Sequence, residues 1–478
     1  MITRREHLTA MLGLAGAPFF QAPARRIADR PVPAAGIGHR IRHISYSDIG
    51  GRPDSVQVML NRRHLYVGHM FSNGVTILDA SDPRRVRPVG FFTAGDQTRT
   101  HHLQVAEDLL LLANGANVVA MQSYDNLRSY FENSLADSIT NRKKFRSGLS
   151  IHDISKPSEM REIAFLEMPG LGINRLWWPG GRYAYVSAHF DGFTDHILCI
   201  VDLKEITKPQ IVSRWWLPGM NRGSGETPTL GPGRRVALHH MLTAEVSNPA
   251  NRLRQSGRDA TRPQAALPGR SADADRPGGQ EAGLHVLGFG AWRDGGLTIH
   301  DLTDPTTPRL MAHTNWSPPF PGGTHTALPL PGRNLIVVAD EANAEKCAKG
   351  TFYTWIVDLR VLDKPVSIAT LPTPRDRDYC ANGTFGPHNL HENRPGSLRS
   401  EETIFATYNN AGVRVFDIRD AFAPKEIASW VPPTPRKLID PRPNVALAAK
   451  SADVYVSTEG LMYVTDWNAG LNVLEYLG

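Results

Sequence analysis

One short segment recurs seven times along the chain, and this repetition limits the possible folds more than any other feature. Five copies begin with glycine, continue with alternating apolar residues and end with an acidic residue five positions later; they start at Gly74, Gly148, Gly296, Gly412 and Gly470. Two further copies, residues 198–202 and 354–358, lack the glycine. Self-similarity on this scale is typical of a repeat architecture. The chain is therefore predicted to form one array of equivalent units.

The sequence around the first copy predicts four short antiparallel strands per repeat. Residues 56–60, 64–67, 75–79 and 87–92 alternate in polarity, and Asp82 with Pro83 marks the last turn between them. A period of two residues bounded by turn signals is typical of strands. Four-stranded units that stack radially are the blades of a β-propeller. We therefore predict an all-β fold, a seven-bladed β-propeller over residues 40–478.

The two ends of this array are expected to pair. The last copy has its third strand at residues 471–476 and no fourth strand after it, whereas residues 40–46 have the character of a fourth strand. Pairing these segments would remove two exposed sheet edges, which are otherwise a liability. We predict that the N-terminal strand closes the ring by joining the last blade.

These repeats resemble the LVIVD-repeat β-propellers of bacterial and archaeal exported or cell-surface proteins. The resemblance rests on residues 198–202, residues 354–358 and the glycine-led copies, and it covers residues 40–478. It implies a propeller outside the cytoplasm but no reaction, because the motif residues serve packing and turns. The glycine frees the loop before the third strand, and the acidic residue sets the turn that follows it. The repeated acids are therefore predicted to be structural.

Residues 1–24 are predicted to be an export signal. Arg4 and Arg5 precede an apolar run over residues 8–20 and a small-residue site at residues 22–24. The arginine pair resembles a twin-arginine signal, and the apolar run is too short to span a bilayer. We expect cleavage near Ala24, a linker over residues 25–39, and a protein without a transmembrane span in the periplasm, secreted or at the cell surface. An uncleaved N-terminal anchor is the alternative.

Charge and cysteine content exclude some classes of protein. A net charge of +6 over 478 residues, with acidic and basic residues interleaved, is too dilute for a nucleic-acid-binding surface. Three cysteines cannot build a disulfide-rich scaffold, and Cys199 lies inside a repeat strand, where a buried apolar role is the default. Cys347 and Cys380 could pair in an oxidising compartment. No dimer interface is indicated, so we expect a monomer.

Long insertions predict which end of the propeller carries the function. Residues 115–147, 218–236, 372–387 and 432–449 all fall in loops that emerge on one face, called the top, and residues 124–144 have helical spacing. Long loops over a rigid scaffold often carry binding and catalysis. Residues 247–281 interrupt blade four on the opposite face, and their composition predicts a disordered insertion.

The sharpest signal of a site comes from the predicted starts of the seven innermost strands. Four of them place histidine at the same position, whereas 18 histidines in 478 residues would supply about 0.3 by chance. Strands that converge on one axis point their imidazoles at a common centre, as zinc, iron and copper require. The predicted metal ligands are His102, His240, His325 and His388.

Other polar residues near these strand starts complete the predicted site. Ser55, Asn174 and Asp453 occupy the equivalent positions in other blades and would leave one side of the metal open. The predicted outer-shell or alternate ligands are His101, His239, His391, Asn174, His69 and His189. Acidic residues at the ends of second strands are predicted general bases: Asp340, Glu341 and Asp466.

Together these residues favour a metal-dependent enzyme, an oxidoreductase or hydrolase that uses iron, copper or zinc on a small organic substrate. The arrangement is similar in outline to metal-dependent propeller oxygenases and oxidases. Three alternatives remain at this point. The histidines could bond only to backbone and water, they could serve metal-free acid–base catalysis, or the protein could be a non-catalytic propeller that binds an envelope partner.

Overall fold

The computed structural model describes residues 36–117, 144–231, 234–247, 284–442 and 445–478. Residues 32–478 belong to one compact unit. The predicted export signal lies outside the described residues, as do nearly all of the segment with helical spacing at 124–144 and of the insertion at 247–281. No helix in the described ranges has the length and apolar character needed to cross a membrane.

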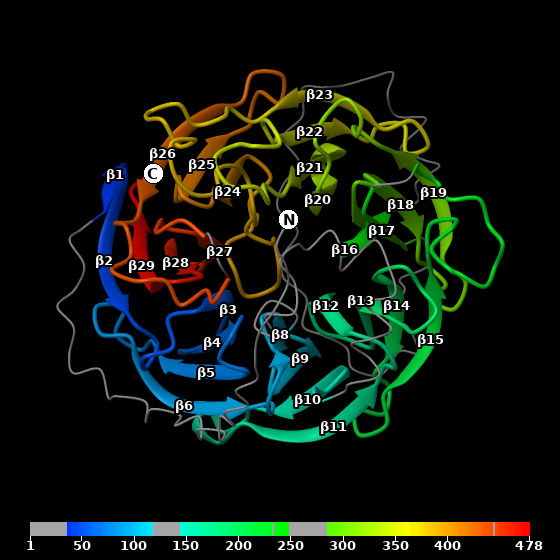
Figure 1. The fold of residues 1–478 in the computed structure, drawn as a ribbon, viewed down its shortest axis with the longest axis horizontal. Helices are drawn as coiled ribbons and strands as arrows, with labels where there is room; N and C mark the ends of the chain where they lie inside the picture. The colour runs from blue at the N-terminus through cyan, green and yellow to red at the C-terminus, as the bar shows by residue number, and fades with distance from the viewer. Residues whose placement is uncertain (1–35, 118–143, 232–233, 248–283, 443–444) are drawn as a thin grey trace, which may run out of the picture. The chain divides into compact units, whose positions relative to one another are not determined.

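The described residues form seven antiparallel modules of four strands, which curl into propeller-like sheets (Figure 1). Modules one to three contain β3 (Ser55–Asn61), β4 (His64–His69), β5 (Gly74–Asp79) and β6 (Arg87–Thr93); β8 (Leu103–Ala106), β9 (Leu109–Ala116), β10 (Gly148–Asp153) and β11 (Arg161–Glu167); and β12 (Gly172–Trp177), β13 (Tyr183–His189), β14 (Ile197–Asp202) and β15 (Gln210–Trp215). A short strand, β7 (Thr98–Arg99), also pairs with β9. The protein is therefore all-β, as its alternating pattern predicts.

Modules four, five and seven follow the same order, whereas module six lacks a regular first strand. Modules four and five contain β16 (Val236–Ser247), β17 (Leu284–Arg293), β18 (Leu297–Asp301) and β19 (Arg309–Thr314); and β20 (Thr324–Leu330), β21 (Leu335–Asp340), β22 (Thr354–Asp358) and β23 (Val366–Thr370). In module six, β24 (Thr403–Thr407), β25 (Val413–Asp417) and β26 (Lys425–Val431) take the second, third and fourth positions, and β1 (Ile37–His39) pairs with β26 outside them. Module seven contains β27 (Ser451–Val456), β28 (Leu461–Asp466), β29 (Gly470–Tyr476) and β2 (Ile41–Ser47).

Neighbouring modules touch through their innermost regular strands. β3 contacts both β8 and β27, β16 contacts β12 and β20, and β24 contacts β27. A single residue pair, Gly115 with Gly172, joins modules two and three into one sheet, and Arg293 with Thr324 joins modules four and five in the same way. Figure 1 shows the first strand of each module toward the middle of the unit and the last strand at its edge.

The N-terminal strands pair as the sequence predicts. β2 runs antiparallel to β29, from Ile41 opposite Tyr476 to Ser47 opposite Leu471, so the predicted pairing with the last module is confirmed. The preceding strand, β1, pairs with β26 of module six. Two consecutive strands therefore pair with two different modules.

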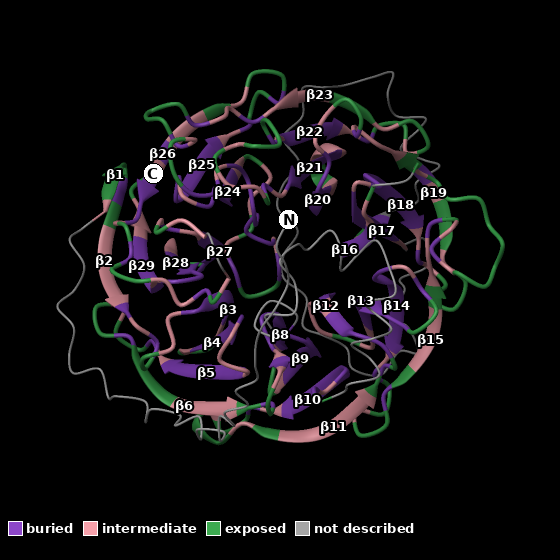
Figure 2. Ribbon diagram, in the orientation of Figure 1, coloured by how far each residue is buried: buried purple, intermediate pink, exposed green. Residues whose placement is uncertain are grey.

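Burial follows the position of each strand within its module (Figure 2). Five of the six residues of β5 are buried, whereas none of the seven residues of β6 is. Third strands are sandwiched between modules, so both of their faces must be apolar or small, and fourth strands need only one such face. This requirement explains why the repeated segment is the most regular part of the sequence.

The glycine and the acidic residue recur in the repeat because of the backbone conformation and the turn that they support. Gly412 adopts a φ of +75°, and a Cβ atom there would lie 2.1 Å from the carbonyl oxygen of Trp430 on the paired strand. In the first copy, Asp79 accepts a hydrogen bond of 3.0 Å from the N–H of Ser81 and pairs with Arg87. The structural roles predicted for the repeated glycine and acid are confirmed at these positions.

The cysteines also take the predicted roles. Cys347 and Cys380 form a disulfide with Cα atoms 5.4 Å apart, which connects the loop after β21 to the segment before β24. Cys199 is fully buried in β14.

Candidate metal centre

The predicted ligands lie where the innermost strands begin, and the backbone is irregular there. β-bulges or register shifts interrupt the pairing of β12 between Ile173 and Arg175, of β16 between Val236 and His240, and of β20 between Thr324 and Thr326. A bulge changes the direction of a side chain that would otherwise face the neighbouring strand layer. As a result, the consecutive residues His239 and His240 each reach a cluster of polar side chains.

The structure distributes the four predicted ligands over two clusters. Ligand atoms that all lie within 4.8 Å of one another belong to His239, His325 and Glu341 in one group and to His102, His240 and Glu392 in the other. The ring of His388 lies 4.7 Å from that of His325, between centroids. We call His239, His325, His388 and Glu341 the Glu341 cluster, and His102, His240 and Glu392 the Glu392 cluster.

The Glu341 cluster has the spacing of metal ligands. Its carboxylate oxygens lie 3.8 Å from Nε2 of His325 and 3.6 Å from Nε2 of His388. Both distances are too long for hydrogen bonds. Two atoms that each lie about 2.1 Å from one ion are separated by about 3 to 4 Å, depending on the bond angle. The ligand atoms of His239, His325 and Glu341 are therefore close enough to surround a single ion, and His388 lies beside them.

Backbone carbonyls set the tautomers of two imidazoles in this cluster. Nδ1 of His239 lies 2.9 Å from the carbonyl oxygen of His325, and Nδ1 of His388 bonds to the carbonyl oxygen of Ala452. Because a carbonyl only accepts, Nδ1 carries the proton in each ring and Nε2 keeps its lone pair. Metal-binding histidines are commonly oriented in this way.

Charge and exposure distinguish Glu341 from its neighbours. Burial raises the pKa of Glu341, but the Arg293 guanidinium, which pairs with its carboxylate, and His388 outweigh this effect and bring the pKa to about 2. Burial also lowers the pKa of His325 well below the usual imidazole value and that of His388 to about 4. The Glu341 side chain is 15% exposed, compared with 2% for His325. The cluster thus combines neutral imidazoles with one anion and opens toward solvent.

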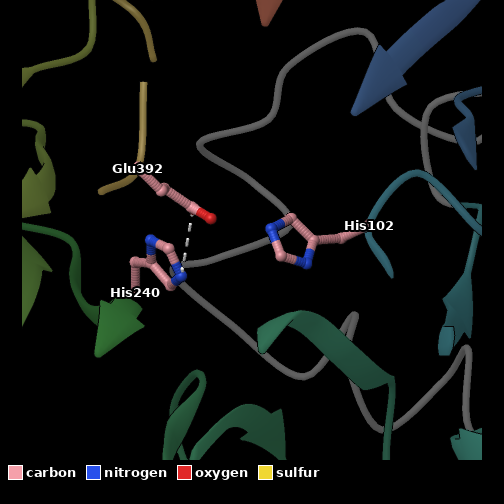
Figure 3. A group of neighbouring side chains, drawn as sticks. All are labelled: His102, His240 and Glu392. Atoms are coloured by element: carbon pink, nitrogen blue, oxygen red, sulfur yellow. Dashed lines mark ion pairs between the residues drawn. The ribbon is translucent and has the colours of Figure 1, made fainter. Parts of the chain in front are cut away.

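The Glu392 cluster suits a cation less well (Figure 3). Figure 3 shows the Glu392 carboxylate between the rings of His240 and His102, and its oxygen lies 3.7 Å from Nε2 of His240. Arg175 at 3.4 Å and Arg394 at 4.0 Å already balance the Glu392 charge. Nδ1 of His102 accepts the N–H of Leu176 at 3.3 Å, which leaves the ring proton on Nε2. A positive ion at this position would lie near two guanidinium groups and near the His102 ring, whose Nε2 carries a proton and has no lone pair for a metal.

The predicted outer-shell histidines are mostly held by other partners. His391 bonds to the carbonyl of Leu398 and the N–H of Val456, so both of its nitrogens are used. Nε2 of His69 bonds to Thr76, and Nδ1 of His189 accepts the N–H of Leu171. The remaining predicted residues are placed as follows: Asn174 accepts a bond from Arg99, and the ring of His101 lies 6.3 Å from that of His102.

Of the three predicted general bases, only Glu341 lies in a cluster. Asp340, the last residue of β21, accepts hydrogen bonds from Thr324 and the Trp355 indole inside its own module. Asp466 accepts the backbone N–H groups of Lys450, Asn468 and Ala469 at 2.7 to 3.0 Å. Glu341 follows the last residue of β21, and its carboxylate pairs with Arg293 rather than with the partners of Asp340.

Four charged residues of the site were not predicted from the sequence: Arg175, Arg293, Glu392 and Arg394. Glu392 and Arg394 belong to an irregular segment that hydrogen-bonds to β24 in place of a regular inner strand, for example through His388 N–H to the carbonyl of Thr407. No other repeat has an equivalent segment. Arg175 did carry a usable signal, since a charged residue between Ile173 and Leu176 breaks an otherwise apolar inner strand.

No protein-family model matches this sequence, and no curated protein matches it. Similar solved structures include a functionally unknown protein from Desulfotomaculum acetoxidans DSM 771, at 9% identity and a TM-score of 0.42, covering 80% of this chain and 90% of that chain. The periplasmic gluconolactonase PpgL of Pseudomonas aeruginosa has 11% identity and a TM-score of 0.47, covering 92% and 96%. Sqt1 of Saccharomyces cerevisiae has 10% identity and a TM-score of 0.46, covering 91% and 98%. Likenesses this distant carry no argument about the site or its chemistry.

Proposed function

We propose that this protein is a metal-dependent enzyme, an oxidoreductase or hydrolase, whose ion is held by His239, His325, His388 and Glu341. The observation that carries the proposal is the position of the Glu341 carboxylate, 3.6 and 3.8 Å from two imidazole nitrogens without hydrogen-bonding to either. Three neutral imidazoles and one carboxylate suit iron, copper or zinc. Relative to the ring of four histidines predicted from sequence, His239 and Glu341 take the places of His102 and His240.

The side chains have distinct tasks in this proposal. The carbonyls of His325 and Ala452 hold two rings with Nε2 toward the ion, and Arg293 fixes the orientation of Glu341. A bound transition metal would supply a Lewis acid that polarises water or substrate. The exposed edge of Glu341 marks the side from which a small organic substrate would approach.

We also propose that the seven modules are the blades of a closed propeller of the LVIVD-repeat type, acting as a monomer outside the cytoplasm. The contact between β27 and β3 and the pairing of β2 with β29 support closure. The disulfide between Cys347 and Cys380 supports an oxidising compartment.

Metal analysis of the purified protein tests the proposed function. We expect about one equivalent of transition metal per chain in the wild type, and its loss in Glu341→Gln and in His388→Gln. His64→Gln, at a partly exposed histidine at the start of β4, is the matched control and should keep the metal.

Two results would overturn the proposal. One is a wild-type protein that holds no stoichiometric metal even after incubation with iron, copper or zinc, which would favour a non-catalytic propeller that binds an envelope partner. The other is equal metal content in Glu341→Gln and the wild type.

A further inference from the structure

One arginine lies among the histidines of both clusters. Arg175, on β12, is 4% exposed. After burial, its charge is among the causes that lower the pKa of His101 and of histidines from both clusters: His102, His239, His240, His325 and His388. The charge of a single guanidinium thus acts on imidazoles of both clusters.

The hydrogen bonds of Arg175 leave one of its three nitrogens without a partner among the described residues. Its Nη1 donates to Oδ1 of Asn389 at 2.7 Å, and its Nη2 lies 3.4 Å from Glu392. Its Nε–H has no hydrogen-bond partner among the described residues, and the same holds for Nε2 of His102. Nε2 of His102 carries the ring proton, because Nδ1 accepts from Leu176. A buried donor without a partner costs about 1 to 3 kcal/mol. Two such donors, on residues that both lie beside Glu392, point to a ligand that accepts.

The charges of the region point to an anion. Arg175, Arg293 and Arg394 face two glutamates, Glu341 and Glu392. A further acid is Asp453, which accepts a hydrogen bond from Asn389; burial and the Glu392 charge raise its pKa to about 7, so it supplies little negative charge. The ion of the proposed function would add two positive charges. Buried charge of one sign is stabilised by a partner of the other sign.

We propose that the substrate carries a carboxylate, which accepts hydrogen bonds from Nε–H of Arg175 and Nε2–H of His102 while the rest of the molecule faces the Glu341 cluster. This inference rests on the proposed function and names the class of its substrate. Two donors match the two oxygens of a carboxylate, whereas a phosphate offers more oxygens than these donors can satisfy.

Acetate and its neutral counterpart acetamide are suitable probes. With ionic strength held constant by NaCl, we expect acetate to raise the melting temperature of the wild-type protein and acetamide to leave it unchanged. The double variant Arg175→Met/Glu392→Gln removes both charges of one ion pair, so that neither is left buried alone. Its acetate affinity should fall at least about tenfold, whereas Arg399→Met, at an exposed arginine, should bind acetate as the wild type does.

The outcomes separate this inference from the metal proposal. Equal stabilisation by acetamide, or unchanged acetate binding in the double variant, would overturn the carboxylate assignment; stronger binding of inorganic phosphate than of acetate would replace it with a phosphate. Metal content is measured on the same samples. The double variant should retain its metal, since its changes lie outside the Glu341 cluster, and a metal-free wild type that still binds acetate through Arg175 would refute only the proposed function.

Discussion

Asp466 shows how a carboxylate at the end of a strand can be wholly engaged in folding. It receives three backbone N–H groups from the segments on either side of β28 and is 1% exposed. Burial raises its pKa to about 6, although the hydrogen bonds from Asn468, Lys450 and Ala469 act in the opposite direction. Its environment is that of a turn anchor, and its titration should be visible in stability.

We expect the stability contributed by Asp466 to fall as the pH rises from about 4 to about 6. The folded-state pKa lies above the ordinary value of 3.8, so the folded protein binds the proton more tightly than the unfolded chain does. Each pKa unit corresponds to about 1.4 kcal/mol. Denaturant unfolding of the wild type and Asp466→Asn at pH 4.5 and pH 7 should show the wild-type advantage shrinking at the higher pH. A constant difference would contradict this assignment.

Single residues also show what could be predicted and what could not. The histidines were found because equivalent positions of a repeat can be compared within one chain, and histidine is rare elsewhere. Which ring nitrogen is free could not be predicted, because it depends on contacts such as that between His388 and the carbonyl of Ala452, 64 residues away. Glu392 and Arg394 were not predicted for a related reason, since they lie in the segment that departs from the repeat.

At the scale of elements, β1 and β2 act as a clasp across two modules. β2 pairs with β29 and completes module seven, and its first residue, Ile41, is buried. β1 pairs with β26 of module six. Strand order elsewhere follows the repeat, so the sequence pattern was sufficient to predict the modules and the β2 pairing. The pairing of β1 was not predicted, because three residues carry too little alternation to identify a strand.

Removal of residues 1–50 should destabilise the protein by about 3 to 5 kcal/mol, because it strips several ladder hydrogen bonds and uncovers the edge of β29. Removal of residues 1–35, which leaves β1 and β2 in place, is the matched control and should have little effect. Thermal unfolding of the two truncated proteins tests this directly. Equal melting temperatures would show that the clasp does not contribute.

At the scale of the whole molecule, Arg394 connects modules that are distant in sequence. It is 2% exposed and donates to Oε1 of Gln104 at 2.6 Å, to the carbonyl of Val105 at 3.0 Å and to that of Trp178 at 3.3 Å. These partners lie near the ends of the inner strands of modules two and three, whereas Arg394 itself extends from module six. One side chain therefore couples both sides of the molecule.

Arg394→Met should lower the free energy of unfolding by about 2 to 4 kcal/mol, because it leaves two buried carbonyls and a glutamine without their donor. Arg399→Met, five residues along the same segment and exposed, should change it by less than about 0.5 kcal/mol. Equilibrium denaturation gives both values. A similar loss in the two variants would assign the effect to the segment rather than to the buried guanidinium.

The position of Arg394 also bears on how small molecules would enter and leave the site. The histidines lie where the inner strands begin, and Arg394 is bonded where two of these strands end. Within the described residues, the exposed edge of Glu341 marks the open side of the site. If both substrate and product pass that edge, substrate cannot enter the site until the product has left it. An enzyme built in this way should be inhibited competitively by its own product.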